Sequence, residues 1–202
     1  SEGPSFFPGF IFPNFDQDAF EDECHDWLKP YFVDAESGRL LMSLHSYIIK
    51  TPKHTIIVDT CVGNHKHRPD TNAWHMKDGP FLNRLIAMGV APESVDFVMC
   101  THLHVDHVGW NTRLVDGLVA DFSQSAQVFA RTELDHWVEI NKKGKKYSDG
   151  CIDDSVLPVL EAGQAEIVAD DYAFDDEIRF EPTPGHTPGH VAIHLASAGA
   201  RA

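Results

Sequence analysis

The chain has 202 residues, a size typical of one domain, and its 43% hydrophobic and 23% charged residues exclude collagen, coiled coil and wholesale disorder. A formal net charge of −15 argues against nucleic-acid binding, which needs a basic surface, so we expect no nucleic-acid partner. No apolar run approaches the ~18–20 residues of a membrane span, and we expect no membrane partner.

The first 35 residues are expected to form an N-terminal cover. Residues 1–15 are rich in phenylalanine, and the prolines among them favour an extended segment over a helix. Asp16 can cap a short helix that runs to about Leu28, because the apolar residues of that stretch fall on one stripe. Both segments are expected to lie on a hydrophobic face of the remaining chain.

In residues 36–202, short apolar strands alternate with amphipathic helices. Strands are predicted at 40–49, 55–58, 97–100, 165–168, 178–180 and 191–195. Helices are predicted at 80–88, from Thr132 to about Lys142, and at 155–162, with a polar irregular segment at 61–78. This alternation predicts an α/β or mixed α+β architecture, and we expect residues 1–202 to form a single domain.

The cysteines indicate a reducing environment. The chain has four, and they are widely spaced: Cys24, Cys61, Cys100 and Cys151. No two of them form a CxxC pair, which excludes a cysteine zinc finger and gives no disulfide framework. A cytoplasmic location fits this usage best.

The strongest chemical signal is the string HLHVDH at 102–107, which directly follows the predicted strand 97–100. Imidazole and carboxylate are the ligands that zinc and similar metals prefer. A lone histidine is more often a core or surface residue. In a chain with 13 histidines, however, the expected number of such strings is only roughly 0.005, so this cluster predicts metal binding.

The spacing within the string suggests two metals. In an extended chain, His102 and His104 point the same way. Asp106 and His107 are adjacent and must diverge, helped by the nearby Gly109. We therefore expect two neighbouring metals, one for each pair.

The string resembles the H-x-H-x-D-H signature of the metallo-β-lactamase-fold hydrolases, and two further motifs agree. Asp59 in TIIVDT is similar to the family's first motif, an Asp that orients the metal loop from behind the ligands. His186 in PTPGHTPGH is similar to the third motif. The resemblance covers roughly residues 40–195 and implies an αββα sandwich, an α+β fold in which two sheets pack face to face with helices outside.

The resemblance also implies a ligand set. His102, His104 and His186 would bind the first metal, and Asp106 and His107 the second. Two zinc ions are expected in the complete enzyme, with manganese, iron or cobalt as alternatives. Family members use a metal-bound hydroxide, and Asp106 would be the catalytic residue that also steers it or carries its proton.

The flanking residues resemble the lactonase, arylesterase and organophosphate-hydrolase branch, which includes quorum-quenching enzymes. The function implied is hydrolysis of a small-molecule lactone, ester or phosphotriester. Two alternatives stay open: β-lactam or thioester hydrolysis on the same fold, and a non-catalytic metal-binding fragment. Trp74, Trp110 and Trp137 are candidates for the wall of a substrate pocket.

The chain departs from the family after His186. The fourth motif, an Asp that bridges the two metals, and the fifth, a late His, are not found: no Asp or Glu follows Glu181, and only His190 and His194 come later. We read His194 as structural and His190 as a loop residue near the site. The C-terminal part of the sandwich is thus expected to be incomplete, and the bare sheet edge predicts poor stability or association, for example as a homodimer.

Overall fold

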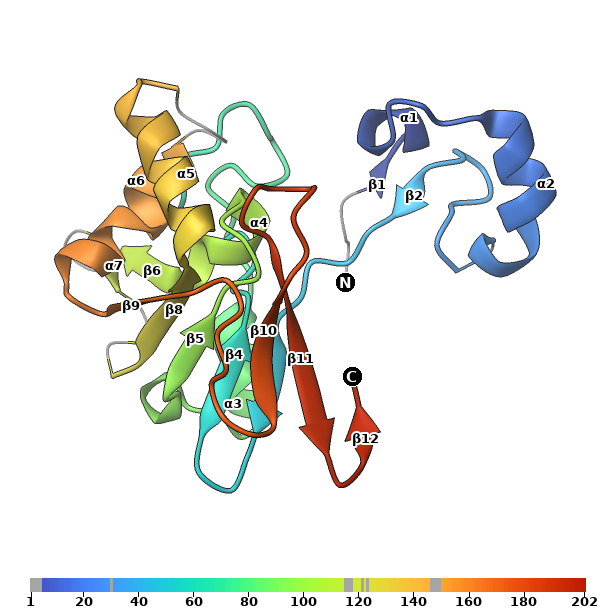
Figure 1. Ribbon diagram of the computed structural model, residues 1–202. Coiled ribbons are helices and arrows are strands. Elements are labelled where there is room, and N and C mark those ends of the chain that lie inside the picture. The colour runs from blue at the N-terminus through green and yellow to red at the C-terminus, as the bar shows by residue number, and fades with distance from the viewer. Residues whose placement is uncertain (1–4, 30, 115–117, 121, 123, 146–149) are drawn as a thin grey trace. The chain divides into compact units, whose positions relative to one another are not determined.

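The computed structural model describes residues 5–29, 31–114, 118–120, 122, 124–145 and 150–202 (Figure 1). Contacts divide the chain into two compact units, Ser1–Leu44 and His45–Ala202. Each unit has its own internal contacts. The role of residues 1–35 as a cover stays a prediction.

The smaller unit contains β1 (Ser5–Phe6), α1 (Pro8–Ile11), α2 (Gln17–Leu28) and β2 (Leu40–Leu41), and β1 pairs antiparallel with β2. Asp16 caps α2 as predicted, because its Oδ1 accepts hydrogen bonds from the backbone N–H groups of Asp18 and Ala19. The prediction that residues 1–15 are extended is wrong at α1. Pro8 occupies the first turn of that helix, where its missing N–H costs no hydrogen bond. Residues 1–4 lie outside the described part.

A five-stranded sheet forms the centre of the larger unit. Its strands are β3 (Tyr47–Lys50), β4 (Thr55–Val58), β5 (Phe97–Met99), β8 (Ala126–Ala130) and β9 (Ala165–Val168), in that spatial order. β3 and β4 form an antiparallel hairpin, and the other pairs are parallel. Since β4, β5 and β8 are parallel, their carboxyl ends meet at one edge of the sheet.

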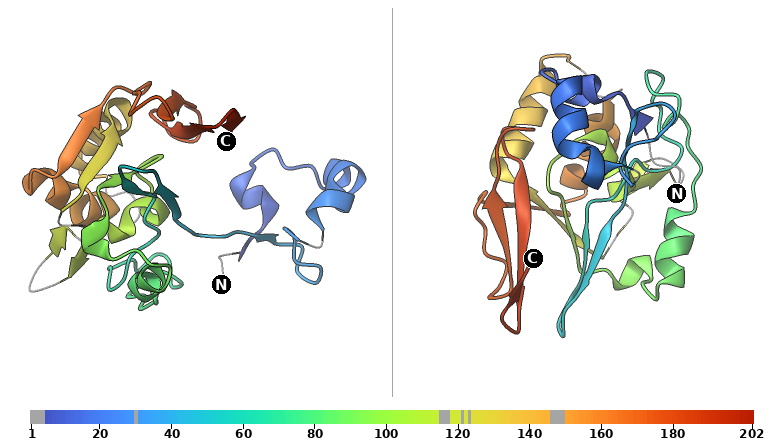
Figure 2. Two further views of the ribbon diagram at one scale, coloured as in Figure 1. Left: turned by 90° about the horizontal axis from the view of Figure 1, so that it is seen from below. Right: turned by 90° about the vertical axis from the view of Figure 1, so that its right-hand side faces the viewer.

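The second sheet is an antiparallel meander of β10 (Ile178–Pro182), β11 (Val191–Ser197) and β12 (Ala200–Arg201). It forms a separate layer beside the first sheet (Figure 2). Ile178, Phe180 and Val191 pack with apolar residues of the first sheet, including Met99 and Val128, in one buried cluster. The alternation of buried and exposed residues along β10 puts one face on this cluster.

Helices cover the other face of the first sheet. They are α3 (Phe81–Ala87), α4 (Val105–Val108), α5 (Arg131–Lys142), α6 (Cys151–Ser155) and α7 (Leu157–Glu161). Their apolar residues join Ile57, Val98 and Phe129 in a second buried cluster. Short 3₁₀ turns at Pro92–Ser94 and Gly109–Asn111 and a hairpin of β6 (Thr112–Leu114) and β7 (Leu118–Ala120) complete the unit. None of the described helices is long and apolar enough to cross a membrane.

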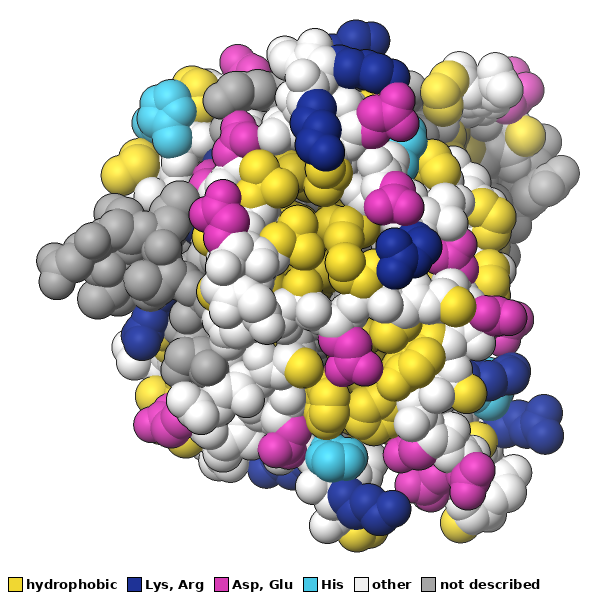
Figure 3. All heavy atoms as spheres, turned by 60° about the vertical axis from the view of Figure 1, so that its left-hand side comes forward, with side chains coloured by type: hydrophobic (Ala, Val, Ile, Leu, Met, Phe, Trp, Pro, Cys, Tyr) yellow, Lys and Arg dark blue, Asp and Glu magenta, His cyan; other side chains and the backbone are white. Residues whose placement is uncertain are grey.

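The larger unit thus has a helix–sheet–sheet order, which confirms the mixed architecture and the face-to-face sheets. From the side of α5–α7, hydrophobic side chains remain visible between charged ones (Figure 3). Some of these helices' apolar residues, such as Leu157 and Leu160, are only partly buried.

Several predicted elements differ from the structure in their bounds, and three of these differences have a local reason. The predicted strand 40–49 is two strands, β2 and β3. The predicted helix 155–162 is α6 followed by α7, with a break at Val156. Pro158 lies in the first turn of α7, where its missing N–H costs no hydrogen bond. Helix α5 begins one residue earlier than predicted, and no side chain caps it. The backbone N–H of Thr132 instead donates to Oδ1 of Asp170.

A buried ion pair holds the irregular segment 61–78 to α6. Arg68 is 1% exposed, and its guanidinium donates two hydrogen bonds to the carboxylate of Asp154, at 2.6 and 2.8 Å. Lys66 is also buried, and its Nζ donates to Thr112 Oγ1 and to the backbone carbonyl of Asp154. The sequence predicted only a polar irregular segment here, and the two buried cations are a finding of the structure.

The backbone after β4 lies very close to the backbone after α4 at Gly109, and a substitution there tests this close approach. A Cβ at Gly109 would lie 1.9 Å from the carbonyl carbon of Val62 and 2.2 Å from the nitrogen of Gly63. We predict that Gly109→Ala lowers the free energy of unfolding by about 1–3 kcal/mol or more, measured by urea denaturation. Gly79→Ala is the control, because its Cβ would make only ordinary contacts. Equal stability of the two variants would contradict this account of the backbone.

Candidate metal centre

The predicted ligands come together at the carboxyl edge of the first sheet. β5 ends at Met99, and the chain continues through Thr101 and 102–104 into the short helix α4. Asp59 follows the neighbouring strand β4, whose carboxyl end lies at the same edge. The loop between β10 and β11, which carries His186, reaches this end of the sheets (Figure 1).

Three histidines converge as predicted for the first metal. One nitrogen each from His102, His104 and His186 lies within 4.8 Å of the other two. The ring centroids are 4.6–4.9 Å apart. A tetrahedral zinc with bonds of 2.0–2.1 Å places its ligand atoms about 3.4 Å apart, so small side-chain movements would close the set. His102 is buried, His104 is half-buried and His186 is exposed.

His102 presents a nitrogen lone pair to this cluster. The hydroxyl of Thr101 donates to Oδ2 of Asp59, so Nδ1 of His102 is assigned as the donor to that hydroxyl at 3.0 Å. Nε2 is then an acceptor, and among the described residues it is buried without a hydrogen-bond partner. A buried polar atom without a partner is costly, and a metal ion would satisfy it.

The surroundings keep two of these histidines neutral, the form that binds metal. Burial lowers the pKa of His102 strongly, and the neighbouring histidines, His107 first, lower it further. Burial, followed by the electrostatic interaction with the His186 ring, lowers the pKa of His104 to about 4. Two neutral imidazoles that face one another are ready for a cation without losing protons first.

His107 and Asp106 form the adjacent pair predicted for a second metal. His107 lies against His102, with ring centroids 3.9 Å apart. Its Nε2 is 3.5 Å from Oδ2 of Asp106. Burial alone would lower the pKa of His107, but hydrogen bonds to Asp106 and Asp59 and their charges together raise it to about 9. Burial likewise opposes ionisation of Asp106, and the hydrogen bond and charge of His107 outweigh it, so that its pKa is lowered.

Asp59 contacts the predicted ligand His107 and the residue before His102, and its role behind the ligands stays a prediction. Its Oδ2 accepts from Nδ1 of His107 at 2.8 Å, which leaves Nε2 of that ring facing Asp106. Its Oδ1 accepts from the backbone N–H of Thr101 at 2.8 Å. Carboxylates that orient ligand histidines in this way tune metal affinity. Asp59 has a φ of 57°, a backbone conformation in which Asp is better tolerated than most residues.

Thr101 is a site residue that sequence reasoning missed. It hydrogen-bonds both Asp59 and His102 through its hydroxyl. Its position directly before the string was the only available signal. His190 lies near the cluster, 4.9 Å from the His102 ring, and its Nδ1 contacts the hydroxyl of Thr183 at 2.8 Å.

The three tryptophans predicted to line a substrate pocket differ in their burial and in their neighbours. Trp110 is 7% exposed and stacks on Phe81 with centroids 5.2 Å apart. Trp137 is equally buried and has its ring 5.2 Å from that of His104. Trp74 is half-buried against the helix-side core. Of the three, Trp137 contacts a predicted ligand, and a substrate-binding role for any of them stays a prediction.

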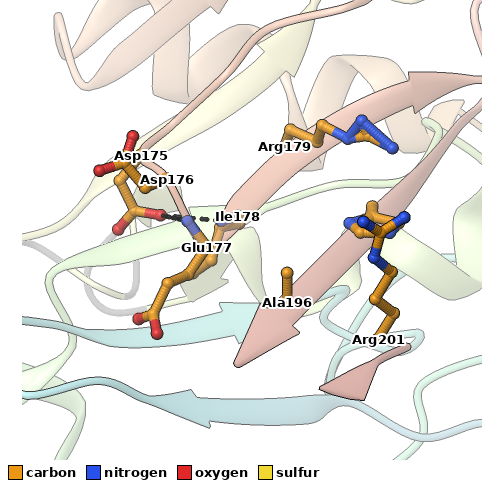
Figure 4. Close-up of a pocket in the computed structure, with 8 residues that line it drawn as sticks. Asp175, Asp176, Glu177, Ile178, Arg179, Ala196 and Arg201 are labelled. Atoms are coloured by element: carbon orange, nitrogen blue, oxygen red, sulfur yellow. Dashed lines mark hydrogen bonds between the residues drawn. The ribbon is translucent and has the colours of Figure 1, made fainter. Parts of the chain in front are cut away.

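A hollow of about 260 Å³ lies away from the histidines. Its lining is mostly charged and comprises Asp175, Asp176, Glu177, Ile178, Arg179, His194, Ala196 and Arg201 (Figure 4). Ile178 pairs with Leu195, whereas Pro182 and Val191 pair beside the His186 loop. The hollow therefore sits at the opposite end of the β10–β11 hairpin from His186.

The residues present fit a metal centre. A buried imidazole nitrogen without a partner, two further histidines within reach, and an adjacent carboxylate–imidazole pair make a nitrogen and oxygen donor set suited to zinc.

The sequence model of the metallo-beta-lactamase superfamily matches residues 42–200. The chain therefore belongs to the metallo-beta-lactamase superfamily.

The chain is similar to proteins named N-acyl homoserine lactonase from Bacillus species. The chain is 24% identical over 168 residues to that of Bacillus cereus, covering 77% of this chain and 60% of the relative. It is 26% identical over 176 residues to N-acyl homoserine lactonase AiiA of Bacillus thuringiensis subsp. kurstaki, covering 78% and 60%. The chain thus spans about 60% of the length of these relatives.

Solved structures agree on the fold. A probable metal-dependent hydrolase from Staphylococcus aureus has a TM-score of 0.76 at 18% identity, covering 98% of this chain and 67% of that one. The hydrolase AbOPH of the beta lactamase superfamily has a TM-score of 0.71 at 24% identity, covering 99% and 66%. AidC, a dizinc quorum-quenching lactonase, has a TM-score of 0.61 at 19% identity, covering 81% and 56%.

Replacing Asp59 tests its place behind the ligands. Asp59→Asn puts an amide where two acceptor oxygens now receive three donors, so His107 loses its fixed orientation. We predict a ten- to hundred-fold weaker zinc affinity, roughly the effect of removing a ligand's orienting partner, measured by chelator competition. Asp171→Asn, at an exposed turn, is the control. Unchanged affinity in Asp59→Asn would contradict the assignment.

The pKa shifts predict a stability optimum for the metal-free protein near the ordinary histidine value of 6.5. His104, with a pKa of about 4, stays neutral when folded, so between pH 6.5 and 4 the unfolded chain binds more protons and stability falls as pH falls. His107, with a pKa of about 9, holds its proton when folded, so its contribution is lost as pH rises from 6.5 through 9.

Thermal unfolding across this pH range measures both effects. His104→Gln should flatten the acid side of the stability profile, and His107→Gln the alkaline side. Profiles of unchanged shape in both variants would show that these histidines do not titrate as described.

Proposed function

We propose that this chain carries the metal-binding part of a hydrolase that opens lactone rings, with N-acyl homoserine lactones as the substrate class. The observation that carries the proposal is the convergence of three histidines around a buried Nε2 of His102 that has no partner among the described residues. The small-molecule substrate is part of the same proposal.

Each predicted ligand has a place in this proposal. His102, His104 and His186 would hold one ion, and Asp106 and His107 lie beside them to hold a second. Zinc suits these donors, and manganese, iron and cobalt are the alternatives. When bound, such ions supply Lewis acidity and lower the pKa of a coordinated water to about 7.

The chain's own residues orient the ligands and move a proton. Asp59 holds the ring of His107 through Nδ1, and Thr101 holds that of His102. Hydrolysis adds the oxygen of water to the lactone carbonyl carbon and breaks the ring C–O bond. A carboxylate oxygen of Asp106 takes the proton from that water and returns it to the leaving alkoxide, so that the product is a hydroxy acid.

We propose a lactone, and not another acyl or phosphoryl substrate, because of the names of the similar proteins. The Bacillus proteins are named N-acyl homoserine lactonases, and AidC was crystallised with a lactonase product. Esters and phosphotriesters need the same attack on an electrophilic centre, and so do β-lactams and thioesters. The ligands do not separate these substrates, and no feature of the described residues favours one of them over the lactone.

The proposal also places the protein in the cytoplasm. Cys61, Cys100 and Cys151 are all free thiols, and two of them are buried. Reduced cysteines of this kind are usual in a reducing compartment.

The direct test is to measure whether the zinc-loaded chain hydrolyses N-hexanoyl homoserine lactone. The release of acid during the reaction is the readout. We expect turnover that needs metal, and His104→Ala should lose most bound zinc and nearly all activity. Asp106→Asn should reduce activity and weaken the second metal more than the first. His190→Ala is the matched control near the site and should be mild in comparison.

Two results would overturn the proposal. Faster hydrolysis of an aryl ester, a phosphotriester or a β-lactam than of the lactone would reassign the substrate. No turnover of any of them by zinc-loaded protein would indicate a non-catalytic metal-binding module.

A further inference from the structure

Glu133 is a buried carboxylate that none of the predicted ligand motifs includes. It lies in the first turn of α5 and is only 1% exposed. Burying a carboxylate is expensive unless hydrogen bonds satisfy it. Its partners therefore indicate why the protein keeps it there.

Both oxygens of Glu133 accept hydrogen bonds from the loops that carry the ligands. Oε1 accepts from the backbone N–H of Leu103 at 3.0 Å, and Leu103 lies between His102 and His104. Oε2 accepts from the backbone N–H of Gly189 at 3.0 Å, three residues after His186. One side chain thus joins segments that are 86 residues apart in the sequence.

Two more contacts fix the carboxylate in place. The indole Nε1 of Trp137, one turn further along α5, donates to Oε1 at 2.6 Å. Gly189 approaches the helix so closely that a Cβ there would lie 2.1 Å from the backbone nitrogen of Glu133. The close approach of Gly189 and the N–H of Trp137 leave the carboxylate little freedom to turn.

We infer that Glu133 is a positioning residue that sets the distance between the His102–His104 loop and the His186 loop, and through it the metal affinity of the three-histidine site. The inference rests on the proposed function, because it assumes that these histidines bind metal. Glu133 touches neither metal nor substrate in this role. It acts through the backbone of the loops that present His102, His104 and His186.

A carboxylate suits this task better than the isosteric amide. Only an ionised carboxylate offers acceptors on both oxygens, whereas glutamine places an NH₂ group against one of the two loops. In Glu133→Gln, the N–H of Leu103 or that of Gly189 would face another donor. The loop whose N–H lacks an acceptor would shift, and the nitrogen atoms of the three histidines would move apart.

The experiment titrates the protein with cobalt(II), whose visible absorption reports coordination geometry, and measures thermal unfolding of each metal-free variant. We expect Glu133→Gln to weaken cobalt binding about ten-fold or more and to change the absorption spectrum. Glu139→Gln is the matched control, because Glu139 lies on the same helix, is exposed and contacts Lys143. It should leave both affinity and spectrum as in the wild type.

The outcomes separate positioning from mere stability. Glu133→Gln with wild-type cobalt affinity and spectrum would overturn the inference, even if its unfolding temperature were lower. Should Glu133→Gln fail to fold, Glu133→Asp takes its place with the same criteria, since it keeps the charge but is too short to reach both loops. If the wild type binds no cobalt, or His102→Ala binds it equally well, the proposed function itself fails.

Discussion

The carboxylate of Asp59 is the contact on which the rest of the site depends. It ties the end of β4 to the loop after β5 through Thr101, and it fixes the ring of His107 through Nδ1. Because β4 and β5 are parallel neighbours, one short side chain can reach both Thr101 and His107. Without the Asp59 carboxylate, residues 102–107 would contain the same metal-binding side chains, but the ring of His107 would not be held in one orientation.

This arrangement brings several imidazole rings close together, which is unfavourable when they are protonated. His102 lies within 5 Å, ring to ring, of His104, His107, His186 and His190. Burial and mutual repulsion lower the pKa of His102 and of His104, so the protein keeps them neutral instead of charged. A bound cation would offset that cost, and proteins retain buried, poorly satisfied polar groups mainly at functional sites.

Much of the fold and the clustering of the histidines could be predicted because their signals are local. The predicted strands at 55–58 and 97–100 correspond to β4 and to β5, which ends at Met99, and HLHVDH places four donors within six residues. The break at Val156 and the helix at Pro8 were missed because proline both stops and starts helices. Arg68 and Glu133 could not be found, because Asp154, Leu103 and Gly189, the partners that explain their burial, lie 30 to 86 residues away in the sequence.

Metal content per chain, measured by elemental mass spectrometry on protein equilibrated with zinc, tests the central claim most directly. The account predicts at least one zinc per chain in the wild type, and a loss of most of it in a variant that lacks His102. A second equivalent, lost first when Asp106 is replaced, would extend the account to the adjacent pair. Zinc-free wild-type protein, or full occupancy without His102, would contradict it.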